Sequence, residues 1–498
     1  MGYSWDDREA LFQNPAVRDF DLRRILTQDY WAQFGGAGIY RPILSLSLAF
    51  DVSVFGDAPY WLHASSLLWH GVAVLLLAAG IQAFCPGAFW PAFALLYFHP
   101  TSAEQAAWLV GRTSALMLAL GGAAMLAARA RRFVLAAVLI FLAAHAREDG
   151  VLFVFVLALL LDREDRRRWL PIGVLVVLAW LAVRWAVLGG VLPRAAHWGT
   201  QSFAALTLTS LDVFGHFAAM LGLVEAPRVM SDGVPSAGPF VVALPLVLTL
   251  LVWAGVRRGQ AARGLVWVLV AFLPFSQWVP HGEAIAGRYA YALLPGFTLF
   301  ALLAMPARMR TRWFCWVIPL LLVPLWLRQA WIVSDGRRAF AQVAAAEPAN
   351  ARAALLRALA HENAGEKKLA LARLRALVKD RPNYAKARVN YGRVLFETGR
   401  YQRAEDVLSR AVRLFPRSAR AALTLGRLQY RRKKFGAAAF AFEEALERDP
   451  RLGQAARYLC RSWLRLGDRE AARAALDVAT RIDARHASLA KLRAAVGQ

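Results

Sequence analysis

Four prolines near the carboxyl end of this chain recur at one constant spacing. Pro348, Pro382, Pro416 and Pro450 are each 34 residues apart. Small residues keep the same phase at positions where two helices must approach closely, namely Ala370, Ala404, Ala438 and Ala472. The period therefore predicts four helix-turn-helix repeats over residues 351–486.

A 34-residue unit of two helices is the tetratricopeptide period. Gly392 and Gly426 occupy equivalent positions on the expected first helix of their repeats, and Leu374, Leu408, Phe442 and Leu476 do so on the second. Each repeat of this kind buries its apolar face only against its neighbours. We therefore expect residues 351–498 to form an α-solenoid of four tetratricopeptide repeats and a capping helix.

The residues before the repeats are apolar enough for a membrane protein. Of 498 residues, 58% are hydrophobic and only 19% are charged, which is too apolar for a soluble protein of this length. A spanning helix needs about 17–25 residues, so the shorter stretches must borrow flanking residues. The apolar stretches lie at about 61–84, 88–98, 108–128, 133–145, 149–161, 169–188, 238–256, 264–280, 289–305 and 313–332.

This pattern predicts an all-α chain with a polytopic membrane helix bundle at residues 61–335. Residues 1–60 would form a first loop with interfacial helices, and residues 336–350 would link the bundle to the repeats. Segments 42–56 and 205–224 are expected to lie in the membrane interface or to re-enter without crossing, because they contain Asp51, Asp212 and His216.

Arginines indicate the orientation. The connections 129–132, 163–168, 257–263 and 306–312 hold 13 arginines, whereas 99–107, 145–149 and 280–288 hold only Arg147 and Arg288. Cytoplasmic loops carry the excess of basic residues. Ten crossings then place both the first loop and the repeats on the outer, periplasmic face of a bacterial inner membrane. Residues 1–60 need help to reach that face, so we expect a further spanning helix upstream of residue 1.

The repeats carry most of the positive charge. Residues 351–498 contain 33 Lys and Arg against 14 Asp and Glu, or +19 of the formal +26. Such an array would face anionic lipid headgroups, bind acidic or lipid-phosphate partners, or simply be a solvated basic surface. Nucleic acid is not expected, because no recognition motif accompanies the charge.

The sequence shows no metal-ligand or disulfide pattern. Cys85, Cys315 and Cys460 are far apart, so we expect each to fill space as a small hydrophobic residue. One carboxylate pair, Asp6 and Asp7, lies in the first loop. Adjacent acids are common in solvated loops, but a membrane enzyme that transfers a group to a hydroxyl needs such a base at the membrane surface.

Several ordered residues resemble the transmembrane and tetratricopeptide repeat-containing O-mannosyltransferases and their bacterial relatives, which belong to the GT-C class of polytopic glycosyltransferases. The resemblance covers nearly the whole chain and lies in order and topology. The residues that carry it are Asp6, Tyr40-Arg41-Pro42, His99-Pro100, Glu104, Ala107-Trp108, Gly111-Arg112, Arg147-Glu148, Arg184, Val187-Leu188-Gly189, Arg288-Tyr289, Tyr291 and Pro295.

The resemblance implies transfer of a sugar, mannose or another hexose, from a polyprenyl-phosphate carrier to an acceptor hydroxyl, with inversion. Asp6 would be the general base, and Asp7 would orient acceptor or donor. Arg288 and Arg112 would bind the carrier phosphate, because guanidinium groups match phosphate oxygens in pairs. Further substrate-binding residues would be Arg41, His99, Glu104, Glu148 and Tyr289. The lipid-linked sugar is the only cofactor-like molecule implied, and the repeats would recruit a protein or glycan acceptor.

Two other classes of function stay open. A non-catalytic, membrane-anchored scaffold for envelope assembly would use the same repeats to gather partners. An oligosaccharide ligase or polymerase would also combine a polytopic bundle with attached repeats. The acidic pair and the arginines on one face favour the sugar transferase over both.

Overall fold

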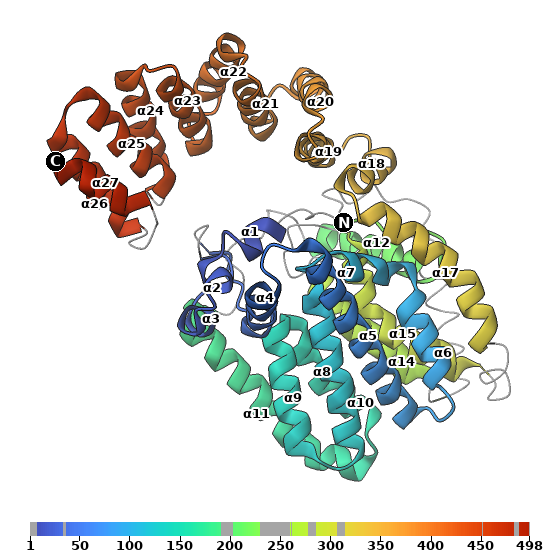
Figure 1. Cartoon of the computed structure of the whole chain (residues 1–498). Helices are drawn as coiled ribbons and strands as arrows, with labels where there is room; N and C mark the ends of the chain where they lie inside the picture. Colours follow the sequence, from blue (N-terminus) through green and yellow to red (C-terminus); the bar gives the residue numbers. More distant parts are fainter. Residues whose placement is uncertain are drawn as a thin grey trace. The chain divides into compact units, whose positions relative to one another are not determined.

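The computed structural model describes residues 7–32, 36–190, 203–229, 259, 261–276, 285–305, 314–450, 452–482 and 488–497. The chain forms two compact units, Met1–Asn350 and Ala351–Gln498. Every regular element among the described residues is a helix, which confirms the all-α prediction (Figure 1).

The apolar stretches of the amino-terminal unit form long helices. The predicted stretch 238–256 lies outside the described residues, and residues 336–346 of the expected linker are helical. The helices are α1 (Asp7–Leu11), α2 (Pro15–Arg18), α3 (Leu22–Thr27), α4 (Pro42–Phe55), α5 (Pro59–Phe84), α6 (Phe89–Phe98), η2 (Pro100–Ser102), α7 (Ala103–Ala107), α8 (Arg112–Arg129), α9 (Phe133–Ala146), η3 (Glu148–Leu152), α10 (Phe153–Leu160), α11 (Arg163–Leu188), α12 (Phe203–Leu221), α14 (Ala261–Phe272), η4 (Leu273–Phe275), α15 (Gly287–Ala304), α17 (Phe314–Val333) and α18 (Gly336–Ala346).

Local signals explain where these helices begin and end. Proline occupies the first turn of both α4 and α5, where its missing N–H costs no hydrogen bond. Asp162 caps α11 by accepting the N–H of Asp165, and Gly189 ends the same helix in a left-handed conformation. α5 and α8 pack closely because Gly122 lies against the backbone of α5, where a Cβ would approach Leu77 N to 2.6 Å.

Three described helices are long and apolar enough to cross a membrane: Pro59–Phe84, Arg163–Leu188 and Gly287–Ala304. Two bent pairs raise this number to five if each is one span. They are Pro100–Ala107 with Arg112–Arg129, bent by 112°, and Val317–Val333 with Gly336–Ala346, bent by 104°. The ten crossings expected from the sequence stay a prediction.

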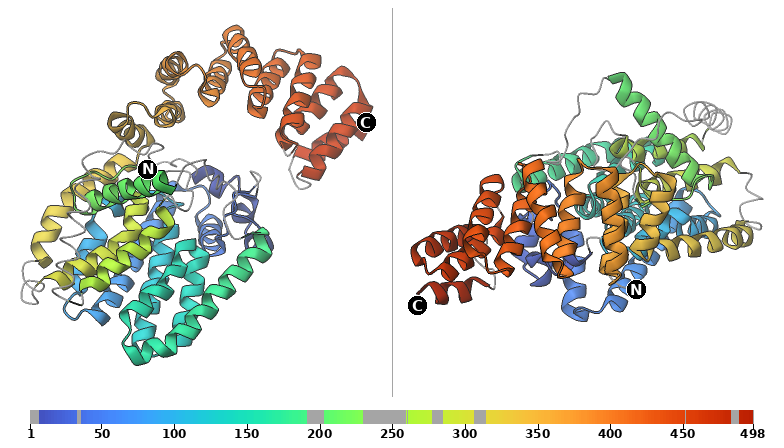
Figure 2. Two further views of the ribbon diagram at one scale, coloured as in Figure 1. Left: turned by 180° about the vertical axis from the view of Figure 1, so that it is seen from behind. Right: turned by 90° about the horizontal axis from the view of Figure 1, so that it is seen from above.

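Helices α8, α9, α10 and α11 run alternately in opposite directions, so their connections gather at two ends (Figure 1). At one end, Arg131 Nε donates to Asp165 Oδ2 at 3.2 Å, which joins the α8–α9 turn to the start of α11. At the other end, Arg147 Nη1 donates to Ser114 Oγ at 2.6 Å, which joins the end of α9 to the start of α8. The first loop lies at this second end, as Figures 1 and 2 show.

The carboxyl-terminal unit consists of helix pairs with the predicted period. Ala404, Ala438 and Ala472 are buried between paired helices, and Gly426 lies against the ring of Phe442. Cys460 is buried here, as Cys85 is in the other unit. The helices are α19 (Ala351–Asn363), α20 (Lys367–Asp380), α21 (Ala385–Glu397), α22 (Tyr401–Leu414), α23 (Ala419–Arg431), α24 (Phe435–Arg448), α25 (Gly453–Leu466), α26 (Arg469–Ile482) and the capping helix α27 (Ser488–Gly497).

Candidate functional site

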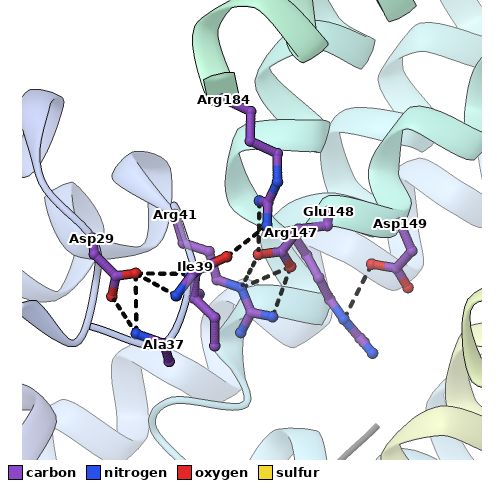
Figure 3. Close-up of polar contacts among 9 residues, drawn as sticks. Asp29, Ala37, Ile39, Arg41, Arg147, Glu148, Asp149 and Arg184 are labelled. Atoms are coloured by element: carbon purple, nitrogen blue, oxygen red, sulfur yellow. Dashed lines mark hydrogen bonds and ion pairs between the residues drawn. The ribbon is translucent and has the colours of Figure 1, made fainter. Parts of the chain in front are cut away.

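The amino-terminal unit gathers charged side chains at the end that holds the first loop. Arg41, at the start of α4, donates from Nε and Nη2 to Glu148 Oε2 at 3.0 and 2.7 Å. Arg184 approaches the other Glu148 oxygen to 3.7 Å from α11 (Figure 3). One carboxylate thus joins three parts of the chain that are remote in sequence.

The charges around Glu148 determine its ionisation. Burial alone would raise its pKa, but the charge and hydrogen bonds of Arg41, assisted by Arg184, hold the pKa below its ordinary value. Glu148 is therefore ionised at neutral pH, and its position indicates that it orients the two arginines. The predicted substrate-binding residues Arg41 and Glu148 are thus brought together as a pair.

A short loop supports this cluster from the side of the first loop. The Asp29 carboxylate accepts the backbone N–H groups of Ala37, Gly38 and Ile39, with the shortest contact, 2.6 Å, at Gly38. The Gly38 carbonyl in turn accepts a hydrogen bond from Arg184 Nη2 at 2.6 Å. Figure 3 shows how Asp29 faces this turn while Arg184 reaches it from α11.

A second group of charges centres on Glu104 and Arg288. The Glu104 side chain is only 4% exposed and accepts a hydrogen bond from Arg288 Nη1 at 3.0 Å. Arg288 lies over the rings of Trp108 and Tyr289, at 5.4 and 5.0 Å from their centroids. Three of the predicted residues, Glu104, Arg288 and Tyr289, therefore lie in contact.

Arg147, the residue before Glu148 in the sequence, lies beside the second group of charges. Its guanidinium lies 5.4 Å from the centroid of Phe275, and Phe275 stacks on Tyr289 with centroids 4.6 Å apart. Arg147 pairs with Asp149 at 3.1 Å and also interacts with the charge of Glu104. Two guanidinium groups, those of Arg147 and Arg288, thus flank one aromatic ring pair.

Arg112, predicted to bind phosphate, lies in a different environment. It is fully buried, 2.7 Å from Asp51, and its other donors reach Ser47, Ser66 and the Leu62 carbonyl. A guanidinium whose donors are used inside the helix bundle is suited to holding helices together. This geometry favours a structural role for Arg112.

The structure describes only one member of the predicted acidic pair, Asp7. Asp6 lies outside the described residues. Asp7 opens α1, is buried, and accepts the Val110 N–H at 3.4 Å, which places the first loop against the segment before α8. His99 is also buried, with Nε2 3.2 Å from the Leu221 carbonyl and Nδ1 2.8 Å from Thr101 Oγ1. His99 therefore ties the η2 segment to the end of α12.

No group of three or more His, Cys, Asp or Glu side chains is arranged to hold a metal ion within the part of the chain that the structure describes.

Two comparisons with family models concern the carboxyl-terminal unit. Tetratricopeptide repeat models match residues 364–419 and 429–496. The carboxyl-terminal unit is a tetratricopeptide array. This confirms the repeat prediction, and repeats of this kind typically mediate protein–protein interaction.

Three solved structures are similar to part of this chain. MamA of Desulfovibrio magneticus RS-1, from residue 41 to the end, is 23% identical over 30% of this chain and 86% of its own, with a TM-score of 0.27. PilF of Pseudomonas aeruginosa is 23% identical over 34% and 75%, with a TM-score of 0.30. A repeat protein of Thermus thermophilus is 19% identical over 35% and 95%, with a TM-score of 0.29. No curated protein matches the sequence.

Sequence reasoning missed several partners that the structure supplies. Asp29 and Phe275 were not among the candidate residues, since one is an ordinary loop acid and the other an ordinary apolar residue. Asp51 was assigned only to an interfacial segment. Arg147 and Arg184 carried a detectable signal, because each is a lone arginine near otherwise apolar sequence.

Proposed function

We propose that the amino-terminal unit is a membrane glycosyltransferase that moves a hexose from a polyprenyl-phosphate carrier to an acceptor hydroxyl. The observation that supports this proposal is the pair of arginines, Arg147 and Arg288, around the Phe275–Tyr289 ring pair. Guanidinium groups suit phosphate oxygens, and aromatic rings offer a flat apolar surface beside them. The proposed location is the periplasmic side of a bacterial inner membrane.

The chemistry assigned to these residues follows from charge. In an inverting transfer, a base removes the proton of the acceptor hydroxyl while the acceptor oxygen bonds to the anomeric carbon of the sugar and the bond from that carbon to the carrier phosphate breaks. Asp6 is the proposed base, next in sequence to Asp7, which opens α1 at this end of the unit. The phosphate leaves with more negative charge, which Arg288 and Arg147 would stabilise. Arg147 takes the place of Arg112 in this proposal because Arg147 lies beside the Phe275–Tyr289 ring pair that Arg288 also contacts, whereas Arg112 lies against Asp51 and the serines.

The decisive experiment is genetic and chemical. Periplasmic proteins and envelope glycans of a deletion strain are compared by mass spectrometry with those of the wild type, and a lost hexose identifies the acceptor. Complementation with Asp6→Asn should fail although the protein is expressed and inserted, because removing a general base lowers rates by about 10²-fold or more. Asp162→Asn, at the opposite end of the unit, is the control and should restore the hexose. Unchanged hexosylation in the deletion strain would contradict the proposal.

A second candidate, a non-catalytic scaffold, is favoured by the tetratricopeptide array itself. It would bring envelope proteins together without modifying them. The same mass spectrometry separates the two functions: a scaffold predicts that the deletion changes complexes recovered by cross-linking while every hexose is retained.

A further inference from the structure

The first helices of the repeats carry arginines at equivalent positions. Arg393 on α21, Arg427 on α23 and Arg461 on α25 are spaced by 34 residues, the repeat period. The first helices of successive repeats also contact one another, and Figure 1 shows them on the inner side of the curved array. The three arginines therefore recur at one position on neighbouring first helices.

The first of these three arginines already binds carboxylates. Arg393 Nη1 and Nη2 donate to the two oxygens of Glu362 at 2.7 and 2.6 Å, which is the two-bonded fork typical of arginine and a carboxylate. Glu397, four residues along the same helix, adds a contact of 3.0 Å. An acidic side chain thus fits this position of the repeat.

The next two repeats keep the arginine and replace both acids. The residues equivalent to Glu362 are Phe396 and Tyr430, and those equivalent to Glu397 are Arg431 and Arg465. Helices α23 and α25 together contain six arginines and no Asp or Glu.

The replaced acids leave their arginines without carboxylates. Among the described residues, neither Arg427 nor Arg461 has an ion pair, and Arg461 lies over the Tyr458 ring at 5.3 Å. Both arginines are partly exposed, while Arg431 and Arg465 are exposed. Four positive charges therefore lie along α23 and α25, and no acid in the described part of the array pairs with them.

We propose that this arginine row, Arg427, Arg431, Arg461 and Arg465, binds an acidic, extended segment of a partner protein. The external carboxylates would take the places that Glu362 and Glu397 occupy at Arg393. An extended chain advances about 3.3 Å per residue and packed helices lie about 8–10 Å apart, so acids at every third residue match the row. This inference does not depend on the transferase activity.

The inner side of the curve also favours a peptide over a lipid surface. A flat bilayer meets the outer and edge surfaces of a curved array, whereas a single extended chain is narrow enough to reach the first helices. The fork at Arg393 moreover binds the planar carboxylate of a side chain. Anionic lipid is therefore the competing occupant that the experiment must separate.

The test uses the full chain in a neutral detergent and a fluorescent peptide of four Glu-Gly-Ser triplets, with a Gln-Gly-Ser peptide for comparison. The double variant Arg431→Glu, Arg465→Glu places an acid four residues after Arg427 and four residues after Arg461, at the same spacing as Glu397 from Arg393. This double variant should weaken binding of the Glu peptide by about tenfold or more, because hydrogen bonds between charged groups are lost. Arg413→Glu with Arg473→Glu makes the same charge change at exposed positions on second helices and should change binding less than about twofold.

A second double variant, Arg427→Gln with Arg461→Gln, removes two arginines of the row without adding acids. It should weaken binding of the Glu peptide by a similar factor. Circular dichroism of each variant checks that the helices are intact. Equal weakening by the row and control variants would reduce the effect to net charge and overturn the proposal. Equal binding of the Glu and Gln peptides would also overturn it. So would vesicles of phosphatidylglycerol that bind in a row-dependent manner while the Glu peptide does not bind.

Discussion

Glu148 accepts hydrogen bonds from Arg41, a residue 107 positions earlier in the chain, and so fastens the first loop to the turn after α9. The two side chains are 26% and 21% exposed. Removing one partner of an ion pair at this depth costs less than at a fully buried pair but more than at a surface pair.

We expect Glu148→Gln to lower the free energy of unfolding by about 1–3 kcal/mol, because two arginines lose their carboxylate. Thermal unfolding of the full chain in detergent measures this effect. Glu164→Gln is the control, since Glu164 pairs with Arg168 on an exposed face of α11 and should cost less than about 0.5 kcal/mol. Equal effects of the two substitutions would show that the Arg41–Glu148 pair does not fasten the loop.

The same pair predicts a pH dependence. The pKa of Glu148 is lowered in the folded protein, mainly by Arg41 acting against burial. The stability it contributes is therefore fully present above the ordinary glutamate pKa of about 4.3 and is lost as the pH falls through the lower, folded-state pKa. The stability difference between wild type and Glu148→Gln should stay constant from pH 8 to about 5 and shrink below pH 4. A difference that shrinks instead above pH 6 would contradict this assignment.

Arg288 is expected to need its planar guanidinium group. Arg288→Lys keeps the charge but loses the paired donors toward Glu104 and a phosphate, so it should weaken use of a polyprenyl-phosphate hexose by about tenfold. Arg288→Ala should weaken it further. Initial rates over a range of donor concentrations measure the effect, with Arg129→Lys, on the other end of the unit, as control. Unchanged donor dependence in both Arg288 variants would remove Arg288 from the proposed phosphate site.

Gly426 tests how closely the paired helices of the repeats pack. A Cβ at this position would approach the Phe442 ring to 2.7 Å, so Gly426→Ala should destabilise the third repeat by about 1–2 kcal/mol. Gly436→Ala on α24 meets nothing within 4 Å and should be neutral or stabilise by up to about 1 kcal/mol. Hydrogen exchange of the amides in α23 and α24 should become faster in the first variant only. Slower amide exchange in both variants would mean that the Phe442 ring moves aside without a loss of stability.

Topology can be tested independently of chemistry. The arginine-rich connections predict that the repeats are periplasmic, so alkaline phosphatase fused after Gln498 should be active. A fusion after Arg131, in an arginine-rich connection, is the matched cytoplasmic control and should be inactive. Activity of the second fusion and not the first would reverse the orientation.

The repeat array and most helices follow from the order of residues along the chain. The 34-residue period of Pro348 to Pro450 predicts the helix pairs, because small and large apolar residues must recur wherever identical units stack. The apolar stretches likewise predict α5, α11 and α15, since long runs without charge leave few alternatives to a buried or membrane-spanning helix.

The pairing of charged side chains, in contrast, depends on how distant helices pack. Arg41, Glu148 and Arg184 are remote in sequence, and their spacing along the chain does not predict the contact between them. Arg112 and Arg147 look alike in sequence, yet one is enclosed by Asp51 and serines while the other lies over Phe275. Helix periodicity depends on a residue's own neighbours along the chain, whereas the partner of a buried charge depends on how distant helices pack.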